Sequence, residues 1–254
     1  MKKLKYNSLD EILRGSISKK DEERSKTVDN NWIWASELGM CPRAQFLRRL
    51  GIPSKRTNWR FTFCGIQGSG IHDKIEAMVK ESKTLIVSEE RFVDKKLRYK
   101  GRMDLLVNLN TKKDPYLSLI DIKTQRPEAF FRRKKLPFNQ RVSAPQKLQL
   151  CSYTYFAKKK WPGIKDSRIY YMDRGGGLRE EYIFHFTKKD FQNMLREIKT
   201  MNNYWDKQII PPCSKTWLCA NSCRPYRKEL LKVESGEITI KEFIKNYVPR
   251  KNKT

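Results

Sequence analysis

The 254-residue sequence predicts a mixed α/β or α+β domain. Two observations support this class. Short runs rich in Leu, Ile and Val alternate with longer segments whose apolar residues repeat at helical spacing. In chain order the pattern is two helices, three strands, a helix, two strands and a helix, which is typical of a sheet flanked by helices. A hydrophobic fraction of 38% is enough for one core.

The N-terminal part begins with a polar, charge-rich segment, residues 1–30, in which a short helix is expected over Ser8–Leu13. Ser36 is a suitable N-cap and Gly51 a stop signal, so a helix is predicted between them. Residues 52–68 are expected to form a connection, and a second helix follows the Gly-Ser-Gly at its end.

The centre of the chain predicts an antiparallel meander of three strands, Thr84–Val93, Leu97–Leu109 and Tyr116–Lys123. Polar turns, one of them with a proline, separate these runs. Residues 124–144 are basic, aromatic and Pro-bearing, and we expect a long loop. A helix follows, with a proline in its first turn, and extends to about Lys159.

The C-terminal part predicts two more strands, Ser167–Asp173 and Leu178–Phe186, around a Gly-rich turn. A Thr-x-x-Asp signature at Thr187 starts a helix that reaches about Lys207. A Pro-Pro break ends that unit, and Thr239 opens a last short helix in the same way.

The charge balance indicates a polyanionic partner. The chain has 55 Lys and Arg against 28 Asp and Glu, a formal net charge of +27. Nucleic acid is the simplest such partner. An anionic membrane is the other candidate, but the sequence has no long apolar span and no outstanding basic amphipathic helix. The N-terminus lacks an apolar signal region, so we expect an intracellular protein whose cysteines are metal ligands or buried thiols.

Asp104 and Asp121 each interrupt an apolar strand, and Lys123 follows two residues after the second acid. Side chains alternate along a strand, so Asp121 and Lys123 share one face. Carboxylates bind hard cations such as Mg²⁺, and a neighbouring lysine can position a water or neutralise phosphate charge. The alternative is solvent-facing charge on edge strands. Apolar neighbours indicate that both acids are buried, and burying an unpaired carboxylate is costly. Two acids in such positions therefore argue for a shared positive partner rather than for solvent-facing charge.

Two helical patterns could support such a site. Gln149 and Tyr153 are spaced i, i+4 and share a helix face, where Gln could orient a water and Tyr could touch a phosphate or base. His72 follows the Gly-rich turn and could bind a metal through neutral imidazole. For each of the three, a structural role is the simpler explanation when the residue is taken alone. His185 is assigned no role.

Three cysteines, Cys213, Cys219 and Cys223, cluster after the Pro-Pro break, and Cys41 lies far upstream. Four thiolates could ligate Zn²⁺ or an iron–sulfur cluster. The other two cysteines are expected to be ordinary buried thiols: Cys64 and Cys151.

The predicted loop 124–144 combines cations with aromatic rings, the pattern of single-strand binding. A solvated loop with a few anchoring rings is the alternative, and the net charge favours binding. The cations are Arg126, Arg132, Arg133, Lys134, Lys135 and Arg141, and the rings are Phe130, Phe131 and Phe138.

In this order, the motifs resemble the PD-(D/E)XK nuclease superfamily, and within it the RecB-type iron–sulfur branch typified by the CRISPR-associated Cas-four exonucleases and similar phage nucleases. The resemblance covers roughly residues 31–224. The matching segments are Leu38-Gly39-Met40-Cys41-Pro42-Arg43, Gly68-Ser69-Gly70-Ile71-His72, Gly101-Arg102-Met103-Asp104, Asp121-Ile122-Lys123, Gln149-Leu150-Cys151-Ser152-Tyr153 and the C-terminal cysteines.

The resemblance implies a restriction-endonuclease-like core with a mixed sheet, and a cysteine module that joins the N- and C-terminal segments. It implies Mg²⁺ or Mn²⁺ held by His72, Asp104, Asp121 and the Ile122 carbonyl. Lys123 would be the catalytic lysine, with Gln149 and Tyr153 supporting the site. Four cysteines would hold a [4Fe–4S] cluster, with Zn²⁺ as the alternative occupant: Cys41, Cys213, Cys219 and Cys223. The last three are spaced C-x5-C-x3-C, where the family usually has C-x2-C-x5-C.

The expected function is a metal-dependent DNA exonuclease acting on single strands or ends, in CRISPR adaptation or in phage or recombination DNA processing. It would work in the cytoplasm of a prokaryote or a phage-infected host. The domains expected are a polar segment at 1–30, the nuclease at 31–210 and a cysteine module at 211–254. The alternatives are a non-catalytic nucleic-acid-binding protein with a structural four-cysteine metal site, and a subunit active only within a larger complex.

Overall fold

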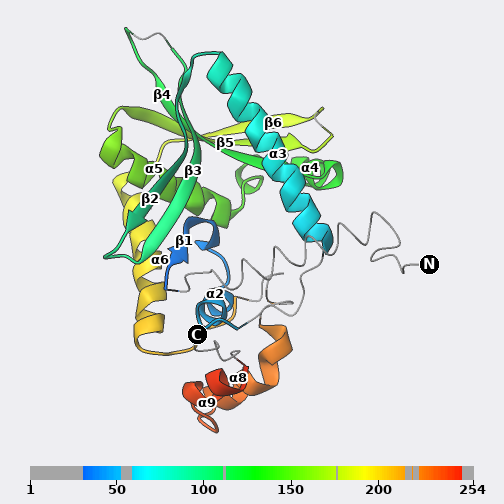
Figure 1. Ribbon diagram of the computed structural model, residues 1–254, viewed down its shortest axis with the longest axis vertical. Coiled ribbons are helices and arrows are strands. Elements are labelled where there is room, and N and C mark those ends of the chain that lie inside the picture. The colour runs from blue at the N-terminus through cyan, green and yellow to red at the C-terminus, as the bar shows by residue number, and fades with distance from the viewer. Residues whose placement is uncertain are drawn as a thin grey trace, which may run out of the picture.

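The computed structural model describes residues 31–52, 59–110, 113–175, 177–214, 219 and 223–247 (Figure 1). The helix expected over Ser8–Leu13 lies outside these residues. The predicted fold class is confirmed, because a central mixed sheet carries helices on both faces. None of the described helices is both long and apolar enough to cross a membrane.

The described elements follow in chain order. They are β1 (Ile33–Trp34), η1 (Ala35–Glu37), α2 (Pro42–Arg49), α3 (Trp59–Glu81), β2 (Leu85–Asp94), β3 (Tyr99–Asn108), β4 (Leu117–Gln125), α4 (Pro127–Lys134), η2 (Phe138–Gln140), α5 (Ala144–Lys160), β5 (Ile164–Asp173), β6 (Arg179–Phe184), α6 (Lys188–Asp206), η3 (Arg224–Tyr226), α8 (Arg227–Glu234) and α9 (Ile240–Tyr247).

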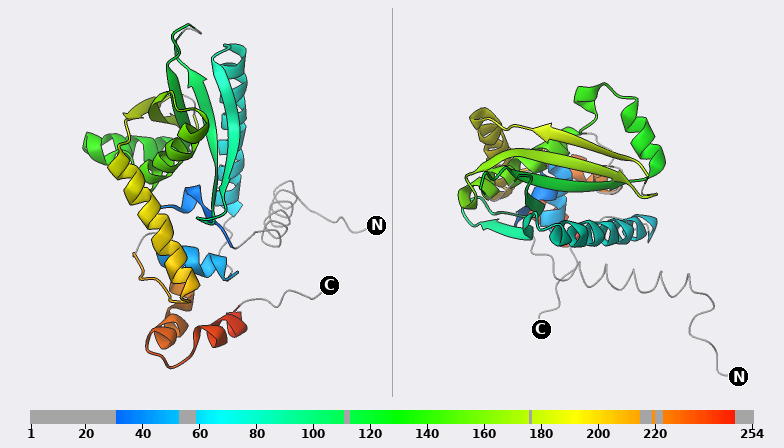
Figure 2. Two further views of the ribbon diagram at one scale, coloured as in Figure 1. Left: turned by 90° about the vertical axis from the view of Figure 1, so that its left-hand side faces the viewer. Right: turned by 90° about the horizontal axis from the view of Figure 1, so that it is seen from above.

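The sheet is antiparallel across β2, β3 and β4, parallel between β4 and β5, and antiparallel again between β5 and β6. The three-stranded meander is thus present as predicted. Helix α3 lies on one face, whereas α5 and α6 lie on the other (Figure 2). Two parallel strands need a crossover connection, and α5 lies in the connection between β4 and β5.

One edge of β3 is divided between two partners. β1 pairs with β3 at Tyr99 and Lys100, and β4 pairs with it only over residues 105–108. The backbone of residues 101–104 has no strand partner on this edge among the described residues. β3 and β4 therefore separate at Asp104, which opens a fork in the sheet.

Two apolar clusters sandwich the sheet. The larger one packs α5 and α6 against it and includes Leu106, Leu119 and Ile169. The smaller one lies under α3, whose Ile75 and Val79 pack against Leu105, Val107 and Ile122. Each acid of the fork thus stands between two packed layers.

The first predicted helix is corrected at its N-terminus. Ser36 is not its cap: residues 33–37 form β1 and η1, and α2 begins at Pro42 with Cys41 as N-cap. Pairing of β1 with β3 and burial of Ile33 account for the difference. A proline in the first turn favours the observed start.

The expected connection over 52–68 is also wrong in part, because α3 begins at Trp59 and passes through the Gly-rich stretch. Packing overrides the poor helix propensity of glycine here. Gly68 is buried, and a Cβ at that position would lie 2.9 Å from the Thr124 Oγ1 atom of β4. A glycine therefore lets the helix approach the sheet.

The expected loop over 124–144 contains α4 and η2 instead. Pro127 occupies the first turn of α4, and Phe130 is fully buried. The helix is amphipathic over only two turns, too few for periodicity to predict it. By contrast, the predicted cap of α6 is confirmed, since Thr187 and Asp190 exchange the two capping-box hydrogen bonds.

We predict that Gly101→Ala destabilises the protein. An added Cβ would lie 2.4 Å from the Phe92 Cζ atom and 2.7 Å from the Ala35 Cβ atom, so the core must shift. Such overpacking costs about 1–3 kcal/mol in the free energy of unfolding, which denaturant titration measures.

Gly70→Ala is the matched control. Apart from its own helix, no described residue has an atom within 4 Å of a Cβ at this position. The substitution should leave stability unchanged or raise it by about 0.5–1 kcal/mol. Equal stabilities for the two variants would contradict the close approach at Gly101.

Candidate active site and cysteine cluster

Asp104 lies where β3 and β4 diverge. Its carboxylate accepts a hydrogen bond from the β4 backbone at that point. The Ile122 amide of β4 donates to Asp104 Oδ2 at 2.7 Å. The ladder between these strands ends at Leu105 and Ile120. A side-chain carboxylate thus accepts the next N–H of β4 and fixes the width of the fork.

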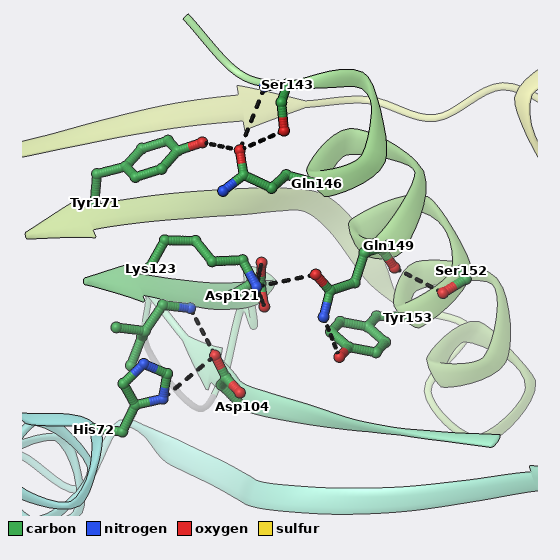
Figure 3. Close-up of polar contacts among 11 residues, drawn as sticks. His72, Asp104, Asp121, Lys123, Ser143, Gln146, Gln149, Ser152, Tyr153 and Tyr171 are labelled. Carbon is green, nitrogen blue, oxygen red and sulfur yellow. Dashed lines mark hydrogen bonds and ion pairs between the residues drawn. The ribbon is translucent and has the colours of Figure 1, made fainter. Parts of the chain in front are cut away.

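A hydrogen-bonded chain runs from Asp121 to α5 (Figure 3). Lys123 Nζ donates to Asp121 Oδ1 and to Gln149 Oε1, both at 3.0 Å. Gln149 Nε2 in turn donates to the Tyr153 hydroxyl at 2.6 Å. The i, i+2 spacing on β4 and the i, i+4 spacing on α5 thus bring four predicted site residues into one hydrogen-bonded series.

The core holds Gln149 in place. The Tyr99 hydroxyl of β3 donates to Ser152 Oγ at 2.7 Å, and Ser152 Oγ donates to the Gln149 carbonyl at 2.7 Å. Tyr99, Gln149 and Ser152 are all buried. The amide of Gln149 therefore points at Lys123 from a rigid base.

His72 reaches the fork from α3, on the opposite face of the sheet. Its Nδ1 atom lies 3.8 Å from Asp104 Oδ2. Gly68, one turn earlier, allows this approach because it contacts β4 closely. Burial, followed by the charge of Lys123, lowers the pKa of His72, which keeps the imidazole neutral and able to bind a metal.

Both acids are in low-dielectric surroundings. Asp121 is 1% exposed, and burial raises its pKa to about 6 despite the opposing charge of Lys123. Burial also raises the pKa of Asp104. Asp121 Oδ2 accepts no well-directed hydrogen bond from any described residue, although Lys123 Nζ lies 2.9 Å away as an ion pair. This oxygen has a lone pair available for a further positive group.

The donor set of His72, Asp104 and Asp121 fits a divalent metal chemically, since it offers carboxylate oxygens and a neutral imidazole nitrogen. These side chains are gathered less tightly than the cysteines described below. The Ile122 side chain packs in the apolar cluster under α3. Its proposed carbonyl ligand stays a prediction.

The four predicted cysteines come together. Their sulfur atoms all lie within 4.8 Å of one another: Cys41, Cys213, Cys219 and Cys223. Cys41 and Cys223 are buried, and all four are free thiols. A hydrogen bond from Cys223 lowers the pKa of Cys41, with a smaller contribution from the Ala44 amide at the start of α2. Such a set can bind a metal.

A separate apolar cluster surrounds these cysteines and joins the two ends of the described chain. Leu47 and Ile52 pack with Leu230 and Phe243 from α8 and α9. Arg43 donates to the Pro211 carbonyl at 2.9 Å and forms an ion pair with Glu234 of α8. The boundary expected at residue 211 stays a prediction.

The predicted DNA-binding residues of 124–144 differ in their exposure. Arg133 is 6% exposed, with its guanidinium 3.4 Å from the centre of the Tyr171 ring, so it faces inward. Phe131 is 54% exposed. Exposed cations flank it on α4 and in the following turn: Arg132, Lys134 and Lys135. Arg126 and Arg141 lie at the two ends of this segment.

Sequence reasoning missed two residues beside the site. Glu89 of β2 has a φ of +50°, and its charge contributes to the raised pKa of Asp104. Gln146, one turn before Gln149, accepts a hydrogen bond from the Tyr171 hydroxyl at 2.7 Å. The i, i+3 spacing of the two glutamines was the available signal for Gln146. No local pattern marks Glu89.

No family model and no curated protein matches the chain. Among the solved structures that are similar to this chain, two illustrate the likeness. The crystal structure of SSO0001 is 18% identical with a TM-score of 0.52, and the match covers 85% of this chain and 94% of that one. An alkaline exonuclease from Laribacter hongkongensis is 10% identical with a TM-score of 0.46, covering 85% and 98%. The likeness to the first of these structures shows a shared fold.

We predict that the purified protein carries metal at the cysteine cluster and that Cys213→Ser reduces the bound amount. Loss of one thiolate weakens the site, and the melting temperature should fall because metal binding stabilises the folded state. Elemental analysis and thermal melting measure both effects.

Cys151→Ala is the control. This thiol is buried in α5 as expected, and burial raises its pKa to about 12, which keeps it from acting as a ligand. Its metal content should equal that of the wild type. Equal metal in Cys213→Ser and the wild type would contradict the assignment. The side chain of Cys64, the other expected buried thiol, lies outside those that the structure describes.

Proposed function

We propose that this chain is a metal-dependent DNA nuclease of the PD-(D/E)XK type, acting as an exonuclease on single strands or DNA ends. The observation that carries the proposal is the fork at Asp104. The buried carboxylate of Asp121, the part-buried carboxylate of Asp104, a lysine and a buried glutamine converge there from three elements. Isolated charges on edge strands would face solvent and would not be linked in this way.

His72, Asp104 and Asp121 would hold Mg²⁺ or Mn²⁺, with the Ile122 carbonyl as a further ligand. When bound, the metal polarises a phosphoryl oxygen and lowers the pKa of a coordinated water. The neutral state of His72 and the open lone pair of Asp121 Oδ2 support this role.

The chain's own side chains supply orientation and charge. Lys123 Nζ is directed by Asp121 and Gln149, so its remaining donor capacity is available for a water or a non-bridging phosphate oxygen. Gln149 fixes that ammonium group and is itself fixed by Tyr153. Burial around Asp121 strengthens each of these charge interactions.

DNA binding is supported by the net charge of +27 and by the exposed cations of α4, which starts two residues after β4 ends. A strand bound there would continue directly into the fork. Protein partners in a CRISPR adaptation complex, or in phage or recombination DNA processing, remain part of the proposal.

We further propose that the cysteine cluster holds [4Fe–4S], with Zn²⁺ as the alternative occupant. Support comes from four thiols within 4.8 Å in a largely apolar surrounding. The cluster would join α2 to the C-terminal helices and act structurally.

We predict that the wild type degrades end-labelled single strands with Mg²⁺ or Mn²⁺, and that Asp104→Ala and Lys123→Ala reduce the rate at least about a hundredfold. Asp104→Ala removes a proposed metal ligand, and Lys123→Ala removes a positive charge that stabilises the transition state. Rates on 5′- and 3′-labelled strands also give the polarity.

Asp114→Ala and Lys165→Ala are controls, because they remove the same charges at exposed positions outside the fork. They should retain near-wild-type rates. Undiminished cleavage by both fork variants would exclude the assigned site. Binding by the wild type without any cleavage would favour the non-catalytic alternative.

We predict that protein purified without oxygen is brown, with broad visible absorption that bleaches on reduction. An iron–sulfur cluster has this signature, and Zn²⁺ has none. A colourless anaerobic preparation with stoichiometric zinc would refute the iron–sulfur assignment and leave the nuclease proposal standing.

A further inference from the structure

The segment 127–141, here called the arch, presents exposed apolar side chains beside the site. It comprises α4, η2 and the turn between them, and it lies at the ends of β5 and β6 (Figure 1). Phe138 is 72% exposed, and Phe131 and Leu136 are 54% and 42% exposed. An exposed apolar group rimmed by cations marks a binding surface more often than an accident of packing.

Sheet register connects the arch to the fork. Asp121 pairs with Ile169, which pairs with Tyr182 of β6. Residues paired in register lie on the same face, so Asp121 and Tyr182 occupy one row, two strand spacings or about 10 Å apart. The Phe138 ring packs on Tyr182, with ring centres 5.4 Å apart and planes tilted by 40°. Phe138 therefore stands at the end of the row that begins at Asp121.

The adjacent row anchors the arch. It runs from Lys123 through Tyr171 to Glu180. Arg133 stacks on Tyr171 and lies 3.5 Å from the Glu180 carboxylate. A planar guanidinium stacked on a ring and paired with an acid resists displacement.

Glu180 also draws in the rest of the arch. Its carboxylate lies 3.8 Å from Lys134 Nζ and 3.6 Å from Arg141 Nη1, and it accepts a hydrogen bond from the Tyr182 hydroxyl at 2.7 Å. Arg141 additionally donates to the carbonyls of Lys134 and Leu136. Phe138 is thus exposed on a backbone that is held at both ends.

We propose that Phe138 is a stacking platform for one unpaired nucleobase, a nucleotide or two from the scissile phosphate. This rests on the proposed nuclease function and deepens it. Base–aromatic stacking needs an unpaired base, so the platform would favour single strands over duplex ends. Exposed cations of the same arch suit the flanking phosphates: Arg132, Lys134 and Lys135. The same positive rim fits an anionic strand better than an apolar protein surface.

The test uses a set of single strands of one sequence, each with one abasic residue, moved stepwise from the end. Binding is followed by anisotropy with Ca²⁺, and cleavage by single-turnover rates with Mg²⁺. The wild type should lose about tenfold in affinity when the missing base is the one that stacks. Phe138→Ala should bind the intact strand about tenfold more weakly. Its affinity should no longer depend on whether the base at that position is present.

Phe138→Trp should restore the abasic profile, because it keeps a stacking ring. Met78→Ala, which truncates a 69% exposed side chain on α3, should behave as the wild type. Circular dichroism and melting check that each variant is folded, as expected at exposed positions.

Four outcomes would overturn the inference. The platform is excluded if the affinity of the wild type does not depend on where the abasic residue lies. It is also excluded if Phe138→Ala loses affinity at the same abasic position as the wild type. In both cases, cleavage by the wild type would leave the nuclease proposal standing. Unchanged strand affinity in Phe138→Ala would point to a protein occupant instead. A wild type that neither binds nor cleaves strands removes the proposed function and this inference together.

Discussion

The fork depends on one hydrogen bond. The Ile122 amide donates to a carboxylate oxygen of Asp104 instead of to a backbone carbonyl of β3. A carbonyl partner would extend the β3–β4 ladder and close the gap. Because the side chain takes the bond, no buried N–H is left unpaired while the strands diverge. The same bond holds the Asp104 carboxylate beside β4, where His72 Nδ1 lies 3.8 Å from it. The other site residues converge on this opening from β4, α3 and α5.

The site concentrates charge where water is scarce, and that arrangement is costly. Asp121 is almost completely buried, and Lys123 is its close counter-charge. A buried acid with one partner is a poor way to stabilise a fold, because desolvation offsets much of the Coulomb attraction. The tightly packed layers on both faces hold this strained arrangement in place. Such a balance is common where groups are kept ready for chemistry. It also explains why Gln149 needs its own anchor through Ser152 and Tyr99.

Local sequence patterns predicted the parts of the fold that depend on interactions between residues close in sequence. Alternation found the meander, and the capping signature found Thr187. It failed where distant packing decides. Gly68 is helical because β4 lies against it, and Ser36 is no cap because β1 pairs with β3. For the site, spacing gave the pairs on β4 and α5. It could not show that the fork joins them, nor that Arg133 turns inward, because both follow from strand register and tertiary contact.

The segment that leads to Cys41 pairs with the same edge of β3 on which the fork opens. β1 occupies β3 at Tyr99 and Lys100, and the chain continues from β1 to Cys41 at the start of α2. β4 occupies the same edge from Leu105 onward. The fork is the stretch left between these two partners. β1 occupies this edge only at Tyr99 and Lys100, and the same segment leads to Cys41, so it links the cysteine cluster to the strand that carries Asp104.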